Sequence, residues 1–285
     1  MPVWPRASRA LAGAALALLA GAAPVWAAPR EAPARVVSIN VCTDQLAMML
    51  AAEGQLVSVS PLATDPAMSS MVDAARRYPS NASRAEEVYL DRPDLVLAGS
   101  FTSRGTVEML RRLGIRVEIF APARSLDEVG ARMLQMGRAL GREDVARARV
   151  AAFERELDAM SHDGPDRPRA ALYAANGYMS GDRTLAGRIL AAAGFDNVAG
   201  ELGLPDGGII PLELLAMAAP DIVITGGDLP GTSRAEAILE HPVISAFRDE
   251  GHRAAVQTAD WTCGTPHVLD AVAALSRLRA GMAEE

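Results

Sequence analysis

The chain has 285 residues, of which 50% are hydrophobic and only 4% aromatic, and its formal net charge is −7. All of its 28 basic residues are arginines. The acidic balance argues against nucleic acid and anionic membrane surfaces as partners, because binding to either favours an excess of positive charge on the protein.

Residues 1–27 predict a cleaved secretion signal. Arg6 and Arg9 precede an apolar run over residues 11–23, and Val25-Trp26-Ala27 suits signal peptidase. The apolar run is too short to cross a bilayer as a helix. We therefore expect export by the Sec route and a soluble periplasmic chain that begins near Ala28. That mature chain has 26 arginines against 35 acidic residues, a net charge of −9, and no transmembrane helix is expected in it.

Residues 28–124 alternate short β-branched runs with helical patterns. Such alternation is typical of βαβ units around a parallel sheet. We therefore expect an N-terminal α/β lobe. Its predicted elements are strands at 35–39, 56–60, 94–99 and 116–120, with helices at 43–52 and 104–114.

Residues 125–163 show no strand pattern, and their apolar residues recur at helical spacing, interrupted only near Gly141. This segment predicts one long linking helix. The alternation resumes in a C-terminal lobe at 164–285, with strands predicted at 169–175, 221–226 and 253–259. The predicted fold is therefore α/β, with two Rossmann-like lobes on parallel sheets, joined by a long helix around a ligand cleft.

A local repeat relates the two predicted lobes. In "EEVYLDRPDLVLAGS" and "LELLAMAAPDIVITGG", Pro93-Asp94 corresponds to Pro220-Asp221. Glu86 and Glu213 each lie seven residues before their proline. Each copy predicts a short helix that leads into a parallel strand, which indicates a pseudo-symmetric protein with its ligand between the lobes.

The loops at the carboxyl ends of the predicted strands supply the candidate ligand site, because open parallel sheets bind ligands there. Their aromatic residues and hydrogen-bond donors suit a wide, planar ligand. Trp261, in "DWTCGTPH", is the strongest candidate contact. The predicted ligand-binding residues are Asn40, Cys42, Thr43, Leu62, Ser100, Phe101, Asn176, Tyr178, Arg183, Asp228, Trp261, Cys263 and His267.

Cys42 and Cys263 are the only cysteines and fall in strand-end loops of different lobes. Three fates remain open for them: a structural role or a disulfide that ties the lobes together, contact with the ligand or its metal, and free inert thiols. Metal ligation would use Cys263 with His267, four residues later on the following helix. The sequence alone does not choose among these fates.

The chain resembles the periplasmic substrate-binding proteins that carry iron chelates and vitamin B12 to ABC importers. The resemblance covers essentially the whole mature chain and rests on four segments in order, "RVVSINVCTDQLAMMLA", "AEEVYLDRPDLVLAG", "PLELLAMAAPDIVITGG" and "DWTCGTPHVLDAVAAL". It implies a monomeric carrier of an iron–siderophore, haem or cobalamin that is not an enzyme and needs no cofactor, since the metal arrives within the chelate. It also implies that Glu86 and Glu213 dock onto arginines of the permease, which works with an ATPase at the inner membrane.

Two other functions fit the sequence less well. A carrier of bare metal ions usually shows converging histidines, whereas the four histidines here are scattered along the sequence. A periplasmic cysteine hydrolase would need Cys42 or Cys263 in contact with a base such as His267 and an orienting carboxylate such as Asp260. The sequence carries no signature of such a hydrolase.

Overall fold

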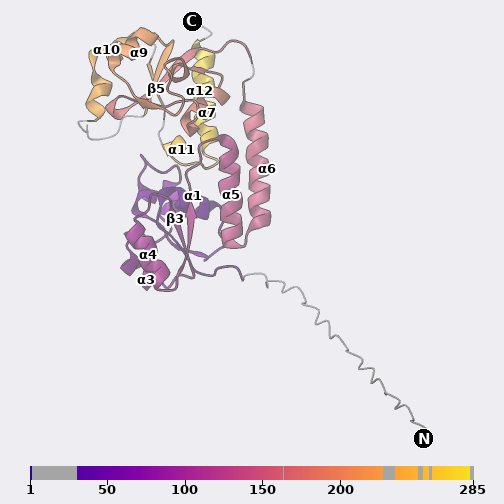
Figure 1. Ribbon diagram of the computed structural model, residues 1–285. Helices are drawn as coiled ribbons and strands as arrows, with labels where there is room; N and C mark the ends of the chain where they lie inside the picture. Colours follow the sequence, from indigo (N-terminus) through magenta and orange to yellow (C-terminus); the bar gives the residue numbers. More distant parts are fainter. Residues whose placement is uncertain (2–30, 163, 227–234, 250–252, 257–258, 283–285) are drawn as a thin grey trace. The chain divides into compact units, whose positions relative to one another are not determined.

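The computed structural model describes residue 1 and residues 31–162, 164–226, 235–249, 253–256 and 259–282. The predicted secretion signal, apart from Met1, and Asp228 lie outside these ranges. Residues 32–285 form one compact unit, which is shown in Figure 1.

The N-terminal lobe is built on a four-stranded parallel sheet in the order β2-β1-β3-β4. The central strands β1 and β3 are buried along their length, as expected for a parallel sheet that is covered on both faces. All four predicted strands and both predicted helices are confirmed. The elements are β1 (Val36–Ser38), α1 (Val41–Leu50), β2 (Leu56–Ser58), η1 (Pro61–Thr64), α2 (Val72–Ala75), α3 (Ala85–Leu90), β3 (Leu95–Gly99), α4 (Arg104–Arg112) and β4 (Arg116–Phe120).

The linking region contains two helices, so the prediction of one long helix over 125–163 is wrong. Ser125 caps α5 (Leu126–Leu140), which ends where Gly141 adopts a left-handed conformation with φ 70°. This conformation reverses the chain, and α6 (Glu143–Met160) packs alongside α5, as Figure 1 shows. Gly137 permits the close approach, because a Cβ there would lie 2.4 Å from the Cβ of Ala146.

The C-terminal lobe has a mixed sheet in the order β10-β9-β5-β6-β8, with β7 also paired to β5. Strands β5, β7, β9 and β10 are parallel, and β6 runs antiparallel to both of its neighbours, β5 and β8. The three predicted strands are confirmed as β5, β9 and β10. The elements are β5 (Arg169–Ala174), η2 (Ala175–Gly177), β6 (Tyr178–Met179), α7 (Leu185–Ala192), β7 (Asp196–Asn197), α8 (Val198–Glu201), β8 (Gly208–Ile209), α9 (Leu212–Ala218), β9 (Ile222–Gly226), η3 (Glu236–Glu240), α10 (Pro242–Asp249), β10 (Arg253–Val256), α11 (Ala259–Thr262) and α12 (Val268–Met282).

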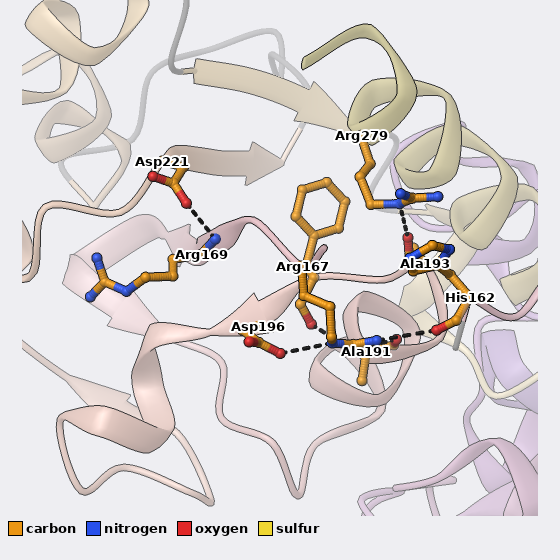
Figure 2. Close-up of polar contacts among 9 residues, drawn as sticks. His162, Arg167, Arg169, Ala191, Ala193, Asp196, Asp221 and Arg279 are labelled. Atoms are coloured by element: carbon orange, nitrogen blue, oxygen red, sulfur yellow. Dashed lines mark hydrogen bonds and ion pairs between the residues drawn. The ribbon is translucent and has the colours of Figure 1, made fainter. Parts of the chain in front are cut away.

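The repeat found in the sequence is also a repeat of hydrogen bonds. The Asp94 carboxylate accepts from the main-chain N–H of Arg35, at 3.1 Å, where the chain enters β1. The Asp221 carboxylate accepts from the main-chain N–H of Arg169, at 2.7 Å, at the start of β5; Figure 2 shows this bond. Each aspartate follows the repeat proline and directly precedes a strand, β3 or β9. Its hydrogen bond therefore holds the start of the first strand of the lobe, β1 or β5, beside that strand.

Candidate functional site

A pocket of about 240 Å³ opens at the carboxyl ends of β1, β3 and β4. Its walls come from the first turn of α1, the segments that follow β3 and β4, and Arg132 of α5. Thr262 and Gly264, at and after the end of α11, complete the lining. Both lobes therefore contribute to this pocket, at the sheet edge where the sequence predicted a site.

Five of the predicted ligand-binding residues line this pocket, namely Asn40, Cys42, Thr43, Ser100 and Phe101. Asn40 also caps α1, since its Oδ1 accepts from the N–H of Cys42 at 3.1 Å and from that of Thr43 at 3.4 Å. The Thr43 side chain is buried, and its Oγ1 donates to the Asn40 carbonyl at 2.9 Å. The polar wall is thus held in place by the start of α1.

Phe101 follows β3 and is 89% exposed, although its ring lines the pocket. A large aromatic side chain is usually covered at least in part, because its apolar area favours burial. The neighbouring wall is also apolar, with Phe120, Ala121 and Pro122 from the end of β4. This part of the site can therefore cover a flat, apolar ligand face.

A second pocket, of about 100 Å³, lies in the C-terminal lobe at the carboxyl ends of β5 and β9. Trp261 of α11 lines it together with Tyr173, Ile224 and Gly226, and Trp261 also packs against the main hydrophobic core. Asp260, the residue before it, accepts a hydrogen bond of 2.8 Å from the Ser70 hydroxyl. Trp261 is therefore fixed in a segment that is bonded to the N-terminal lobe.

Cys42 and Cys263 form a disulfide bond. It joins the first turn of α1 to the loop between α11 and α12, and Cys42 lines the larger pocket. The hypothesis that Cys263 ligates a metal as a thiolate is therefore wrong in this structure, and the hydrolase alternative lacks a free thiol. His267, the other metal candidate, has its Nδ1 3.3 Å from a carboxylate oxygen of Asp270. Within the described part of the chain, no group of three or more metal-ligating side chains comes together.

Leu62, Asn176, Tyr178, Arg183 and His267 do not line either of these two pockets, and their roles stay predictions. Arg183 pairs with Asp206. Asn176 has a φ of 58° and donates its main-chain N–H to the Ala235 carbonyl at 2.8 Å. Tyr178 pairs with Ala174 and with Ile209 in the sheet.

Asp44 follows the pocket-lining Thr43 in α1 and is a buried carboxylate that was not among the predicted site residues. Its Oδ2 accepts from the hydroxyl and the main-chain N–H of Ser60, and no donor among the described residues reaches its Oδ1. Burial raises the pKa of Asp44 to about 6, although the nearby Ser38 hydroxyl and the hydrogen bonds from Ser60 lower it in part. An acid in a first helical turn is normally expected to be exposed and favoured by the helix dipole, so no local pattern indicated this burial.

Arg132 was also missed, although it lines the larger pocket from α5. Its Nη1 donates to Gln135 Oε1 at 2.9 Å, and Gln135 is in turn bonded to Glu118 and to the Ile119 carbonyl on β4. A polar residue within an amphipathic helix is usually assigned to the solvent side. The spacing of buried residues around it, Val129, Met133 and Met136, was the one indication that Arg132 lies at the edge of the buried face.

None of the helices in the described segments combines the length and the apolar composition that a membrane crossing requires.

Two α/β lobes with a pocket at the ends of their parallel strands define a bilobal ligand-binding protein. Residues 36–248 match the family described as periplasmic binding protein, and the chain belongs to this family. The resemblance that the four sequence segments indicated is therefore confirmed. No curated protein matches the chain in sequence.

Solved structures share the fold at low sequence identity. The periplasmic heme-binding protein HutB of Vibrio cholerae is 18% identical with a TM-score of 0.72, over 86% of this chain and 98% of that one. A periplasmic heme-binding protein from Pseudomonas aeruginosa is 23% identical with a TM-score of 0.70, over 86% and 91%. The vitamin B12-binding protein BtuF of Vibrio cholerae is 16% identical with a TM-score of 0.67, over 89% and 99%. The predicted two-lobe α/β fold is confirmed by these likenesses.

Proposed function

We propose that this chain is the soluble periplasmic component of an ABC importer for a metal chelate, namely an iron–siderophore, haem or cobalamin. It is exported by the Sec route, works as a monomer, captures the chelate between its lobes and delivers it to the permease and ATPase complex at the inner membrane. It performs no chemistry on the cargo. The metal arrives as part of the chelate, so no resident cofactor is needed.

The observation that carries this proposal is the exposed ring of Phe101 beside a pocket lined by both lobes. A planar chelate would cover this ring and recover the free energy of apolar burial, roughly 25 cal/mol per Å². The pocket of about 240 Å³ is smaller than the roughly 300–1,000 Å³ typical of sites that enclose a whole ligand. In this proposal it receives an edge or a substituent of the chelate, while the flat face lies against Phe101.

The structural relatives support the same class of cargo. The proteins from Vibrio cholerae and Pseudomonas aeruginosa with this fold are described as binding heme or vitamin B12. Both ligands are wide metal macrocycles with a flat face. The cysteine disulfide is consistent with a carrier, because it leaves no thiol nucleophile at the pocket.

Delivery would use Glu86 and Glu213, one on each lobe. Both are exposed and both are the second residue of their helix, α3 and α9 respectively. Exposed carboxylates in a first helical turn suit charge-assisted pairing with arginines of a partner. Each lies outside the two described pockets, so docking and cargo binding use separate surfaces.

Native mass spectrometry of the purified, exported chain tests the proposal. Haemin, cyanocobalamin and ferrichrome are added separately, and one of them is expected to give a one-to-one complex that survives desalting. No complex with any of the three, together with turnover of a model ester, would overturn the carrier function.

A further inference from the structure

We propose that Leu90 and Met217 are apolar anchors that dock this chain onto its membrane partner. Each lobe then presents one carboxylate and one apolar side chain, and the partner presents two equivalent sockets, each with a cation beside an apolar pocket. The inference rests on the proposed function, in which the partner is the permease of an importer.

The two anchors are among the most exposed large apolar side chains in the structure. Leu90 is 77% exposed and Met217 is 80% exposed. Each lies four residues after the glutamate of its helix, Glu86 or Glu213, and residues at this spacing share one helix face. The opposite faces are buried, through Ala85 and Val88 in α3 and through Leu215 in α9. A carboxylate and an apolar side chain therefore point outward together in each lobe.

The internal repeat places these two patches in equivalent positions. Leu90 and Met217 are each three residues before the repeat proline, Pro93 or Pro220. The leucine and methionine differ in type but not in exposure or bulk. An exposed apolar side chain at one of these positions would be unremarkable on its own. Its recurrence at the equivalent position, with an exposed glutamate one turn earlier each time, indicates that both patches meet the same kind of surface.

Two equivalent arginines bond to the main chain directly after the anchors. The Arg35 guanidinium donates to the carbonyl of Asp91, the residue after Leu90, at 2.6 Å. The Arg169 guanidinium donates to the carbonyl of Ala218, the residue after Met217, at 2.9 Å. Both arginines therefore fix the carbonyl that directly follows an anchor.

The turns that end the two helices are also equivalent. Arg35 also donates to the Arg92 carbonyl at 3.3 Å, and Arg169 also donates to the Ala219 carbonyl at 2.9 Å. Arg92 and Ala219 both have positive φ angles, 48° and 42°. In each lobe a residue with positive φ, bonded through its carbonyl to an arginine, therefore lies two residues after the anchor, where the helix ends. A preformed patch loses less conformational entropy when a partner covers it.

The chemistry of the patches defines the partner. Apolar anchors that fill a pocket dominate many protein interfaces, and rim charges set orientation and association rate. Two equivalent patches on a pseudo-symmetric chain fit a partner whose two halves carry the same site, as in a two-fold dimer. The expected socket is an arginine or lysine beside an apolar pocket. The C-terminal patch is extended by Leu214, which is also exposed and lies three residues before Met217 on α9.

Photo-cross-linking in living cells tests the partner directly. A benzophenone amino acid is placed at position 90 or at position 217 of the full chain, and at the exposed Leu113 as a control. Positions 90 and 217 are expected to cross-link the same integral membrane polypeptide, and position 113 is expected not to. Different polypeptides from the two sites, cross-links to a second copy of this chain, or no cross-link at either site would overturn the inference.

Uptake measurements test whether the anchors contribute to transport. The double variant Leu90→Asp with Met217→Asp is compared with Leu113→Asp, using radiolabelled haemin, cyanocobalamin and ferrichrome. The double variant is expected to lower uptake at least tenfold, with unchanged melting temperature and unchanged chelate affinity of the purified protein, while the control keeps full uptake. Unchanged uptake by the double variant would contradict the role of Leu90 and Met217 as anchors but not the proposed carrier function. Failure of the purified wild type to bind any of the three chelates would instead contradict the proposed function. The cross-linking experiment would still test the docking surface in that case, because it does not depend on which chelate is bound.

Discussion

The sulfur atoms of Cys42 and Cys263 are bonded to each other, although the two residues are 221 positions apart in the chain. The bond ties the first turn of α1 to the loop before α12, at the wall of the larger pocket. The hydrogen bond between Ser70, in the segment before α2, and Asp260 of α11 joins the same two lobes at a second place. The disulfide and this hydrogen bond therefore restrain the motion of one lobe relative to the other, and the disulfide does so at the wall of the candidate site.

We predict that the disulfide stabilises the folded chain by several kcal/mol. Closing a loop of this length removes about 5 kcal/mol of denatured-state entropy in the loop-closure description. The double variant Cys42→Ser with Cys263→Ser should therefore unfold at lower denaturant concentration, as measured by circular dichroism. The unfolded wild type should take up no thiol reagent before reduction and two equivalents after it. Uptake of reagent before reduction would show that the bond is absent.

The buried carboxylate of Asp44 should make stability depend on pH. Burial raises its pKa to about 6 in the folded state, against a usual value of 3.8. The folded state therefore binds this proton more tightly than the unfolded state does. The stabilisation that proton binding at Asp44 contributes is fully present below about pH 4 and is lost as the pH rises through 6. The difference of about two pKa units corresponds to about 3 kcal/mol.

The variant Asp44→Asn should consequently gain stability relative to the wild type as the pH is raised from 4 to 8. Urea unfolding at several pH values measures this difference. Asp73→Asn is the matched control, because Asp73 is exposed and pairs with Arg76 on the same helical stretch. If the free energy of unfolding differs between the wild type and Asp44→Asn by the same amount at pH 4 and at pH 8, the raised pKa of the buried Asp44 is contradicted.

Phe101 should contribute to cargo affinity through its aromatic face. Phe101→Ala is expected to weaken chelate binding roughly tenfold or more, since covering an aromatic ring contributes about 1.5–3 kcal/mol. Phe101→Leu keeps apolar bulk without the ring and should recover part of the affinity. Neither substitution should lower the melting temperature, because the side chain is exposed. Equal affinities for the wild type and both variants would remove Phe101 from the site.

Glu86 and Glu213 should affect transport but not cargo binding. The double variant Glu86→Ala with Glu213→Ala is expected to reduce uptake about tenfold through lost charge-assisted contacts with the permease. Glu108→Ala, on the exposed side of α4, serves as the control and should leave uptake unchanged. If the purified double variant loses affinity for the chelate, the glutamates belong to the cargo site and not to a docking surface.

The strands of three or more residues could be predicted from the sequence, because buried parallel strands leave a clear pattern. The position of the pocket could be predicted as well, because the carboxyl ends of parallel strands meet at one edge of a sheet. The pairing of Cys42 with Cys263 could not, since a separation of 221 residues carries no geometric information. The two-residue strands β6 and β8 are too short to show an alternating pattern.

The reversal between α5 and α6 was missed for a different reason. Helical spacing continues on both sides of Gly141, so periodicity alone joined the two helices. The useful sign was the glycine itself, which is the residue that most readily takes the left-handed conformation at a helix end. For Asp44, burial depends on its contact with Ser60 from a different segment, which no local pattern reveals.

The central claim is that this chain binds a metal chelate between its lobes, and tryptophan fluorescence tests it most directly. Of the three tryptophans, only Trp261 lies beyond the predicted secretion signal, so the fluorescence of the exported chain reports a single position beside the smaller pocket. Titration with haemin, cyanocobalamin or ferrichrome should quench this fluorescence, saturating at one equivalent for one of the three and weakening in Phe101→Ala. Fluorescence that stays constant with all three chelates, in a chain that is folded by circular dichroism, would contradict the claim.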